Sequence, residues 1–244
     1  MSWQDILNNF HLFLSGLWVT IHLISLSLFI GFLLSIPLAL IRHFKVPILN
    51  RTVWCYTYFF RATPLLLQIF LIYYGSGQFQ WLRESWMWFL LEKAYFCALL
   101  AFTLNTTAYT TEIIRGALDT MNPREIEAGF TFGMTKAQVY RRIVLPNALR
   151  RCIPAYSNEV IFLFHSSAVA SVITVNELTG VASYLYAKYY DPFTPFLTVA
   201  GFYMVLIFSI IFFFRQLEKK FLKYLSAAAI DQKKFFFGNP PVQT

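Results

Sequence analysis

Five long stretches of this sequence contain no Asp, Glu, Lys or Arg. They lie at residues 6–41, 62–82, 94–111, 160–176 and 192–214. A helix needs about 20 mainly apolar residues to cross a bilayer, and each stretch with its flanks is close to that length. The pattern predicts an all-α polytopic membrane protein with five transmembrane helices, at residues 14–41, 46–74, 94–114, 153–175 and 193–214.

The composition supports this prediction. The chain has 244 residues, of which 57% are hydrophobic and 13% charged. Soluble domains carry charge at about a quarter of their positions. The apolar fraction excludes a disordered chain, and a cytosolic globule would have too little polar surface to cover itself. We expect residues 1–230 to form a single transmembrane domain in the lipid bilayer, and residues 231–244 to be a disordered tail.

The net charge of +8 is unevenly distributed. Basic residues gather in segments 42–51, 115–151 and 215–234, which alternate with segments that have few of them. Cytoplasmic loops of membrane proteins carry the excess of Lys and Arg. We therefore expect a membrane protein with its N-terminus outside, its C-terminus in the cytoplasm and the tryptophan-rich loop near residues 81–88 outside. Basic groups that flank spans in this way argue against nucleic acid as a partner.

The connection at residues 115–151 has the signals of two short helices. Asn122 is a good N-cap for the first helix, and Gly133 can adopt the left-handed conformation that ends it. Thr135 opens a second capping box, and Pro146 is expected to end the second helix. A loop that only connected two spans would not need these signals.

Seven residues of this connection keep the spacing of a known motif. They are Glu127, Ala128, Gly129, Gly133, Ile143, Leu145 and Pro146. They resemble the E-A-A-x3-G-x9-I-x-L-P loop of ABC-transporter permeases, with Gly129 in place of the second alanine. The resemblance implies a type I ABC importer permease fold, in which this two-helix coupling loop contacts a separate ATP-hydrolysing subunit. An ordinary surface helix hairpin is the alternative.

Other segments resemble the polar amino-acid uptake family of these permeases. They are residues 60–68 (FRATPLLLQ), 104–112 (LNTTAYTTE), 154–159 (PAYSNE) and 165–167 (HSS). The similarity extends from about residue 16 to residue 222 and is strongest to histidine and arginine importers. It implies a location in the bacterial plasma (inner) membrane. It also implies a second permease chain, identical or sister, together with ABC ATPase subunits and a periplasmic or extracellular solute-binding protein.

The sequence lacks the Gly-x4-Gly-Lys-Ser/Thr motif of P-loop ATPases. We therefore expect a transport subunit rather than an enzyme, with no cofactor of its own and with ATP and Mg²⁺ used by the partner ATPase. The Gly-x-Ser-x-Gly and His-Glu-x-x-His motifs of hydrolases are also absent. A passive channel, or a permease for a different small polar solute, is the alternative function.

Charged residues inside spans are costly, so they usually face a cavity or a partner. Arg61 and Glu159 are the most isolated charges in apolar sequence. Arg61 can bind the carboxylate of an amino acid through its planar guanidinium, while Glu159 can bind an ammonium or a cationic side chain. Thr63, with its hydroxyl, and Gln68 are further candidate ligands.

Two points about these candidates stay open at this stage. Pro64 and Pro154 are expected to break the helices beside Arg61 and Glu159, which would free backbone groups near a site. Alternatively, Arg61 and Glu159 form a salt bridge that holds the second and fourth spans together. Glu112 is expected to lie at the membrane interface near Arg115 rather than to bind substrate.

Overall fold

The computed structural model describes residues 3–222, and no strand occurs within that range. The α-helices are α1 (Trp3–Asn8), α2 (Phe10–His43), α3 (Leu49–Ala62), α4 (Leu65–Phe70), α5 (Gln80–Arg83), α6 (Trp88–Leu91), α7 (Ala94–Asp119), α8 (Pro123–Thr131), α9 (Lys136–Val139), α10 (Leu145–Ser166), α11 (Leu178–Tyr189) and α12 (Phe193–Phe221). Two π-helical segments, η1 (Leu71–Gly75) and η2 (Tyr140–Val144), and the 3-10 helix η3 (Ser167–Ile173) complete the described chain. The predicted all-α fold is confirmed.

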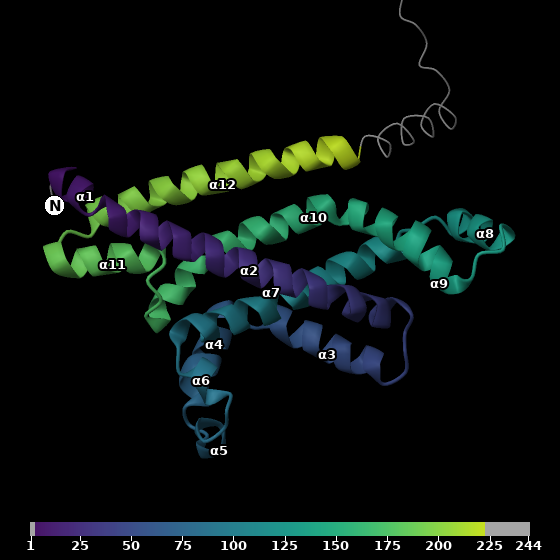
Figure 1. Cartoon of the computed structure of the whole chain (residues 1–244), viewed down its shortest axis with the longest axis horizontal. Helices are drawn as coiled ribbons and strands as arrows, with labels where there is room; N and C mark the ends of the chain where they lie inside the picture. Colours follow the sequence, from purple (N-terminus) through teal and green to yellow (C-terminus); the bar gives the residue numbers. More distant parts are fainter. Residues whose placement is uncertain (1–2, 223–244) are drawn as a thin grey trace, which may run out of the picture.

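The helices long and apolar enough to cross a membrane include α2 and α12. Two bent pairs meet the same requirement when each is taken together: α3 with α4–η1, and the run Lys136–Ile173 with α11. In Figure 1 the long helices lie side by side, with α8 and α9 at one end and α1 and α11 at the other. The coupling loop and α1 therefore lie at opposite ends of the group of long helices.

Helix α7 covers the predicted third span but is less apolar than α2 and α12. It packs against α2, α3 and α10, and half of its 26 residues are buried. A helix surrounded by other helices faces protein rather than lipid, so it can carry polar side chains. This accounts for the threonines and Asn105 on its buried surface.

Small residues of α2 allow α7 and α11 to approach closely. The buried small residues of α2 are Gly16, Thr20, Ser27, Gly31, Ser35 and Ala39. A Cβ atom on Gly31 would lie 2.5 Å from Cγ2 of Thr106 in α7, and one on Gly16 would lie 2.8 Å from Cγ2 of Val181 in α11. Small residues at such positions are typical of helix contacts inside membranes.

Replacing Gly31 with alanine is expected to destabilise the α2–α7 contact. Overpacking of a well-packed interior costs about 1–3 kcal/mol. The double variant Gly31→Ala/Thr106→Ser removes the opposing Cγ2 and should recover most of the loss. Thermal unfolding of the detergent-solubilised chain measures both effects. Equal stability of the single variant and the wild type would contradict this expectation, because it would show that α2 and α7 accommodate the added methyl group without loss of stability.

The predicted second span is not one straight helix. Segments Leu49–Ala62 and Leu65–Gly75 meet at an angle of 107°. Thr63 between them is extended, with φ −105° and ψ 144°, as expected for a residue that precedes proline. The expected break at Pro64 is therefore present, and it turns the chain sharply directly after Arg61.

Two other proline predictions were wrong. Pro146 does not end the second short helix, because α9, η2 and α10 form one run from Lys136 to Ile173. Pro146 follows the π-helical turn η2, where the regular α-helical hydrogen bonds are already interrupted, so its missing N–H does not end the run. Pro154 lies inside α10 without ending it. The helical run that contains the predicted fourth span consequently begins well before residue 153, while the span boundaries stay a prediction.

Helix α11 lies where the sequence predicted only a connection between the last two spans. Its N-cap, Glu177, accepts hydrogen bonds from the backbone N–H groups of Thr179 (2.9 Å) and Gly180 (2.8 Å). Leu178, Val181, Ala182 and Leu185 of α11 are buried. The predicted tail at residues 231–244 lies outside the described residues, and a single domain over residues 1–230 stays a prediction.

Candidate functional site

The break between α3 and α4 is held by two buried amide side chains. Gln68 is 3% exposed, and its amide donates to the carbonyl oxygens of Phe60 (2.8 Å) and Thr63 (3.1 Å) and to the Thr63 hydroxyl (2.8 Å). Asn105 of α7 donates to Oε1 of Gln68 (3.0 Å) and to the Phe60 carbonyl (3.3 Å). Carbonyl groups that Pro64 leaves without an N–H donor are thereby satisfied. Thr63 and Gln68 are thus engaged within the chain, and their contact with substrate stays a prediction.

Arg61 lies in the last turn of α3 and is exposed. Its guanidinium carbon lies 5.4 Å from the centre of the Tyr109 ring in α7. The Tyr109 hydroxyl donates to the carbonyl oxygen of Arg61 at 3.4 Å. A cation over an aromatic ring is favoured by about 0.5–1 kcal/mol at an exposed site. This contact holds the guanidinium beside the surface of α7.

Glu159 lies on α10 and is only 6% exposed. Its Oε1 atom has no hydrogen-bond partner. Within residues 3–222, the ion pairs shorter than 4.0 Å include neither Arg61 nor Glu159, although the charge of Arg61 acts on the carboxylate. The alternative of a direct salt bridge is therefore not formed in this structure. A buried carboxylate oxygen without a partner is costly and calls for an explanation.

Two aromatic rings, one of them against Arg61, belong to the same region, and sequence reasoning did not identify them. The ring centroids of Tyr109 and Phe162 are 6.3 Å apart, and Phe162 is 50% exposed. Phe162 follows Glu159 by three positions, so both lie on one face of α10. This three-residue spacing was the one signal in the sequence that could have associated Phe162 with Glu159. The residues offer a donor for anions at Arg61, an acceptor for cations at Glu159 and aromatic surface at Tyr109 and Phe162.

The coupling segment has the predicted capping structure. The Asn122 side chain accepts a hydrogen bond from the backbone N–H of Arg124 at 3.0 Å. Gly133 follows α8 with φ +74°, in the left-handed region. The Thr135 backbone donates to Oε1 of Gln138 at 2.8 Å, and the Gln138 backbone donates to the Thr135 hydroxyl at 3.4 Å. The caps and the turn between the two short helices are confirmed.

The seven motif residues divide into exposed and packed groups. Glu127 and Ala128 are exposed, whereas Gly129 is buried against η2. A Cβ atom on Gly129 would lie 3.0 Å from Cγ2 of Val139 and 3.1 Å from Cδ1 of Ile143, which explains a glycine at this position. Leu145 and Pro146 are partly buried.

Two aromatic residues of α8 and its C-cap are also exposed, and the sequence analysis did not select them. Phe130 is 46% exposed and Phe132 is 85% exposed. With Glu127 they give α8 an apolar surface that carries one acidic group, the kind of surface a protein partner can cover. A contact between the motif residues and an ATPase stays a prediction.

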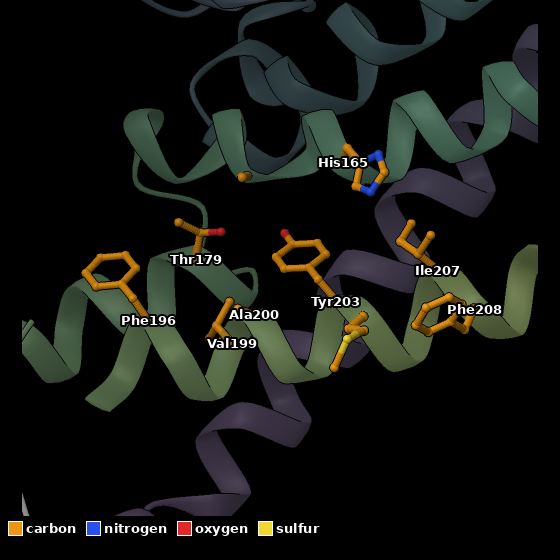
Figure 2. A pocket seen from close by; sticks show the side chains of 10 residues that line it. His165, Thr179, Phe196, Val199, Ala200, Tyr203, Ile207 and Phe208 are labelled. Carbon is orange, nitrogen blue, oxygen red and sulfur yellow. The ribbon is translucent and has the colours of Figure 1, made fainter. Parts of the chain in front are cut away.

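Figure 2 shows a separate groove of about 560 Å³ between α10, α11 and α12. Neither Arg61 nor Glu159 lines it, and most of its wall is apolar. The Tyr203 hydroxyl in this groove donates to Oε2 of Glu177 at 2.9 Å and lies 2.9 Å from the Ser167 hydroxyl. The Tyr203 hydroxyl is therefore engaged within the chain, and His165 and Thr179 are the other polar side chains on the wall.

Comparison with known proteins shows which family this sequence and fold resemble. Residues 27–223 match the family of binding-protein-dependent transport system inner membrane components. The nopaline transport system permease protein NocM of Agrobacterium fabrum is 41% identical over 86% of this chain and 88% of its own length. The histidine/lysine/arginine/ornithine transport system permease protein HisM of Escherichia coli K12 is 37% identical over 88% of this chain and 91% of its own. The solved structure of an amino acid ABC transporter with histidines matches 90% of this chain and 99% of its own, with 29% identity and a TM-score of 0.80.

Proposed function

Since this chain belongs to the family of binding-protein-dependent transport system inner membrane components and is a permease subunit of an amino-acid ABC importer, we propose that it transports basic amino acids. The arginine and histidine class is the preferred substrate. The chain itself would form the translocation path, while ATP hydrolysis would take place in a partner subunit.

The observation that carries this proposal is the buried Oε1 of Glu159 that lacks a partner. A fixed anion beside aromatic rings favours a cationic group, because ring faces and carboxylates both attract positive charge. Arg61 supplies an exposed guanidinium for the carboxylate that every amino acid carries. The names of the relatives HisM and NocM, a histidine/lysine/arginine/ornithine permease and a nopaline permease, agree with a substrate of this class.

The proposed complex contains two permease chains, a pair of ABC ATPase subunits that use ATP and Mg²⁺, and an external solute-binding protein. The exposed surface of α8, with Glu127 and Phe132, is the part of the chain available to the ATPase. The second permease chain would complete the translocation path together with this one. Whether this second chain is identical or a sister is decided by purifying the complex and counting its distinct subunits.

Reconstitution tests the function directly. The complex is placed in proteoliposomes with ATP inside and the binding protein outside, and uptake of labelled arginine, histidine, glutamine and a sugar is measured. ATP-dependent uptake of arginine or histidine is expected. ATP-independent flux would indicate a channel, and uptake of the sugar alone would indicate a permease for another solute.

The predicted orientation has its own test. In a Cys55→Ser background, which removes an exposed thiol, cysteines are introduced at Ser85 or Ala137. A membrane-impermeant thiol reagent applied to intact cells should label the Ser85→Cys variant and leave the Ala137→Cys variant unlabelled until the cells are opened. The reverse pattern would place the N-terminus in the cytoplasm.

A further inference from the structure

One side chain, His43, joins the end of α2 to two other segments. Its Nδ1 lies 2.8 Å from Oδ1 of Asp119 at the end of α7, and its Nε2 lies 3.3 Å from the hydroxyl of Tyr140 at the start of η2. A carboxylate can only accept, so Nδ1 donates to Asp119, while either Nε2 or the Tyr140 hydroxyl can be the donor of the second bond. The His43 side chain is 17% exposed and that of Asp119 is 45% exposed. We call these three residues the His43 clasp.

Aromatic packing places the Tyr140 hydroxyl within reach of His43. The ring centroids of Phe44 and Tyr140 are 4.7 Å apart, and those of His43 and Tyr140 are 5.9 Å apart. Nζ of Lys136 in α9 lies 4.9 Å from the centre of the Phe44 ring. The end of α2 therefore contacts both α9 and η2. Figure 1 shows α9 at the same end of the molecule as this end of α2.

A network of ion pairs fixes the same end of α7 to α2 and α3. Asp119 accepts from Arg115 at 2.7 Å, and Arg115 also pairs with Glu112 at 2.8 Å. Glu112 in turn pairs with Arg42 of α2 at 3.2 Å, and Arg42 donates to Asn50 of α3 at 2.7 Å. The expected position of Glu112 near Arg115 is confirmed. Ion pairs and a hydrogen bond thereby connect the end of α2 to the end of α7 and to the start of α3.

The segment that carries Tyr140 is itself irregular. The five residues of η2 form a π-helical turn between α9 and α10, and such turns are frequent at functional sites. Since the run Lys136–Ile173 is continuous, a displacement of α9 passes directly into α10, which carries Glu159. The apolar contacts between this run and α7 have no directional preference, whereas the hydrogen bonds of the His43 clasp do.

We propose that the His43 clasp transmits movement of α9 to α2 and α7, so that these helices move together with α10. The proposal rests on the proposed function, in which a separate ATPase moves α8 and α9. Without the clasp, α9 would still displace α10 but would lose its directional link to the other spans. His43, Asp119 and Tyr140 are thus positioning residues that contact one another rather than Arg61 or Glu159.

The variant Tyr140→Phe tests this in the complete complex in proteoliposomes. It removes one hydroxyl and keeps the ring that packs on Phe44. Uptake per ATP hydrolysed is expected to fall about fivefold, the effect of one lost hydrogen bond, while ATP hydrolysis changes by less than about twofold. The control Tyr186→Phe removes an exposed hydroxyl that has no hydrogen bond within residues 3–222, and its uptake per ATP should equal that of the wild type.

A covalent cross-link between positions 43 and 140 tests whether uptake per ATP can be restored when the hydrogen bond is absent. In the Cys55→Ser background, His43→Cys/Tyr140→Cys lacks the clasp and should show low uptake per ATP. A reversible bifunctional thiol reagent that joins the two cysteines should restore the ratio, and reduction should abolish it again. Cys97 and Cys152 are buried and do not compete for the reagent.

Two outcomes would overturn the proposal that the His43 clasp transmits movement. One is a proportional fall of uptake and ATP hydrolysis in Tyr140→Phe, which indicates a structural role. The other is inhibition of uptake by the cross-link, which indicates that the contact must open during transport. Failure of the proposed function looks different, because the wild-type complex would then show no ATP-dependent amino-acid uptake in the same vesicles.

Discussion

The substitution Gly133→Val is expected to reduce transport at least about tenfold while the chain still inserts into the membrane. Gly133 has φ +74°, and the left-handed conformation costs other residues about 1–2 kcal/mol, more for a β-branched side chain. A Cβ atom at this position meets no neighbour within 4 Å, so the strain comes from the backbone rather than from packing. The turn between α8 and α9 would open, and the two helices would lose their fixed angle.

Co-purification of the ATPase with the tagged permease measures the first effect, and ATP-dependent uptake measures the second. Gly133→Asn is a graded variant, because asparagine tolerates the left-handed region better than valine and should retain more activity. Gly116→Ala is the matched control: Gly116 lies in α7 with open space around its Cα, so alanine there should be neutral or slightly stabilising. Normal ATPase binding and uptake in Gly133→Val would contradict a coupling role for this turn.

The features predicted correctly from the sequence are those that depend on a few neighbouring residues. The caps at Asn122 and Thr135 and the turn at Gly133 depend on contacts within four positions of each residue. The apolar length of α2 and α12 is a property of composition alone. Local chemistry determines such elements, so no knowledge of packing was needed.

The errors arose where distant segments decide the outcome. Pro64 and Pro154 look alike in sequence, but only Pro64 ends a helix, and the amides of Gln68 and Asn105 satisfy the carbonyl groups there. Glu177 begins α11 by accepting from Tyr203 of α12 as well as from its own backbone. Glu177 and Tyr203 are 26 residues apart in the sequence, and Phe60 and Asn105 are 45 residues apart. Such contacts exist only once the helices have packed together.

The same limit applied to the candidate site. Arg61 and Glu159 were identified as isolated charges, but the contacts of Arg61 with Tyr109 and of Tyr109 with Phe162 depend on three helices packing together. A sequence pattern could not distinguish a salt bridge from two charges that are close without pairing. The structure makes this distinction, and the two cases predict opposite effects on stability.

Replacing Glu159 with glutamine is therefore expected to leave the chain as stable as before, or more stable, while impairing transport of cationic substrates. The substitution keeps size and hydrogen-bonding capacity but removes a buried charge whose Oε1 has no partner. Relief of that cost favours the folded state. A residue that supported Arg61 through a direct ion pair would behave oppositely, because its loss would leave the cation unpaired.

Glu177→Gln is the control within the same chain. Glu177 is also buried, but its oxygens accept hydrogen bonds from Thr179, Gly180 and Tyr203. Its neutralisation weakens charge-assisted bonds and should lower thermal stability. Any fall in uptake should be the same for arginine and glutamine, because Glu177 is not part of the candidate site.

Uptake of arginine and glutamine, normalised to membrane abundance, decides the role of Glu159. A hydrogen bond to a charged group contributes about 1.5–3 kcal/mol against about 1 kcal/mol for a neutral one, so Glu159→Gln should reduce arginine uptake about tenfold more than glutamine uptake. Arg61→Ala should impair both substrates, since both carry the carboxylate that Arg61 would bind. Equal losses for the two amino acids in Glu159→Gln would show that the carboxylate does not select charge, and substrate choice would then belong to the external binding protein.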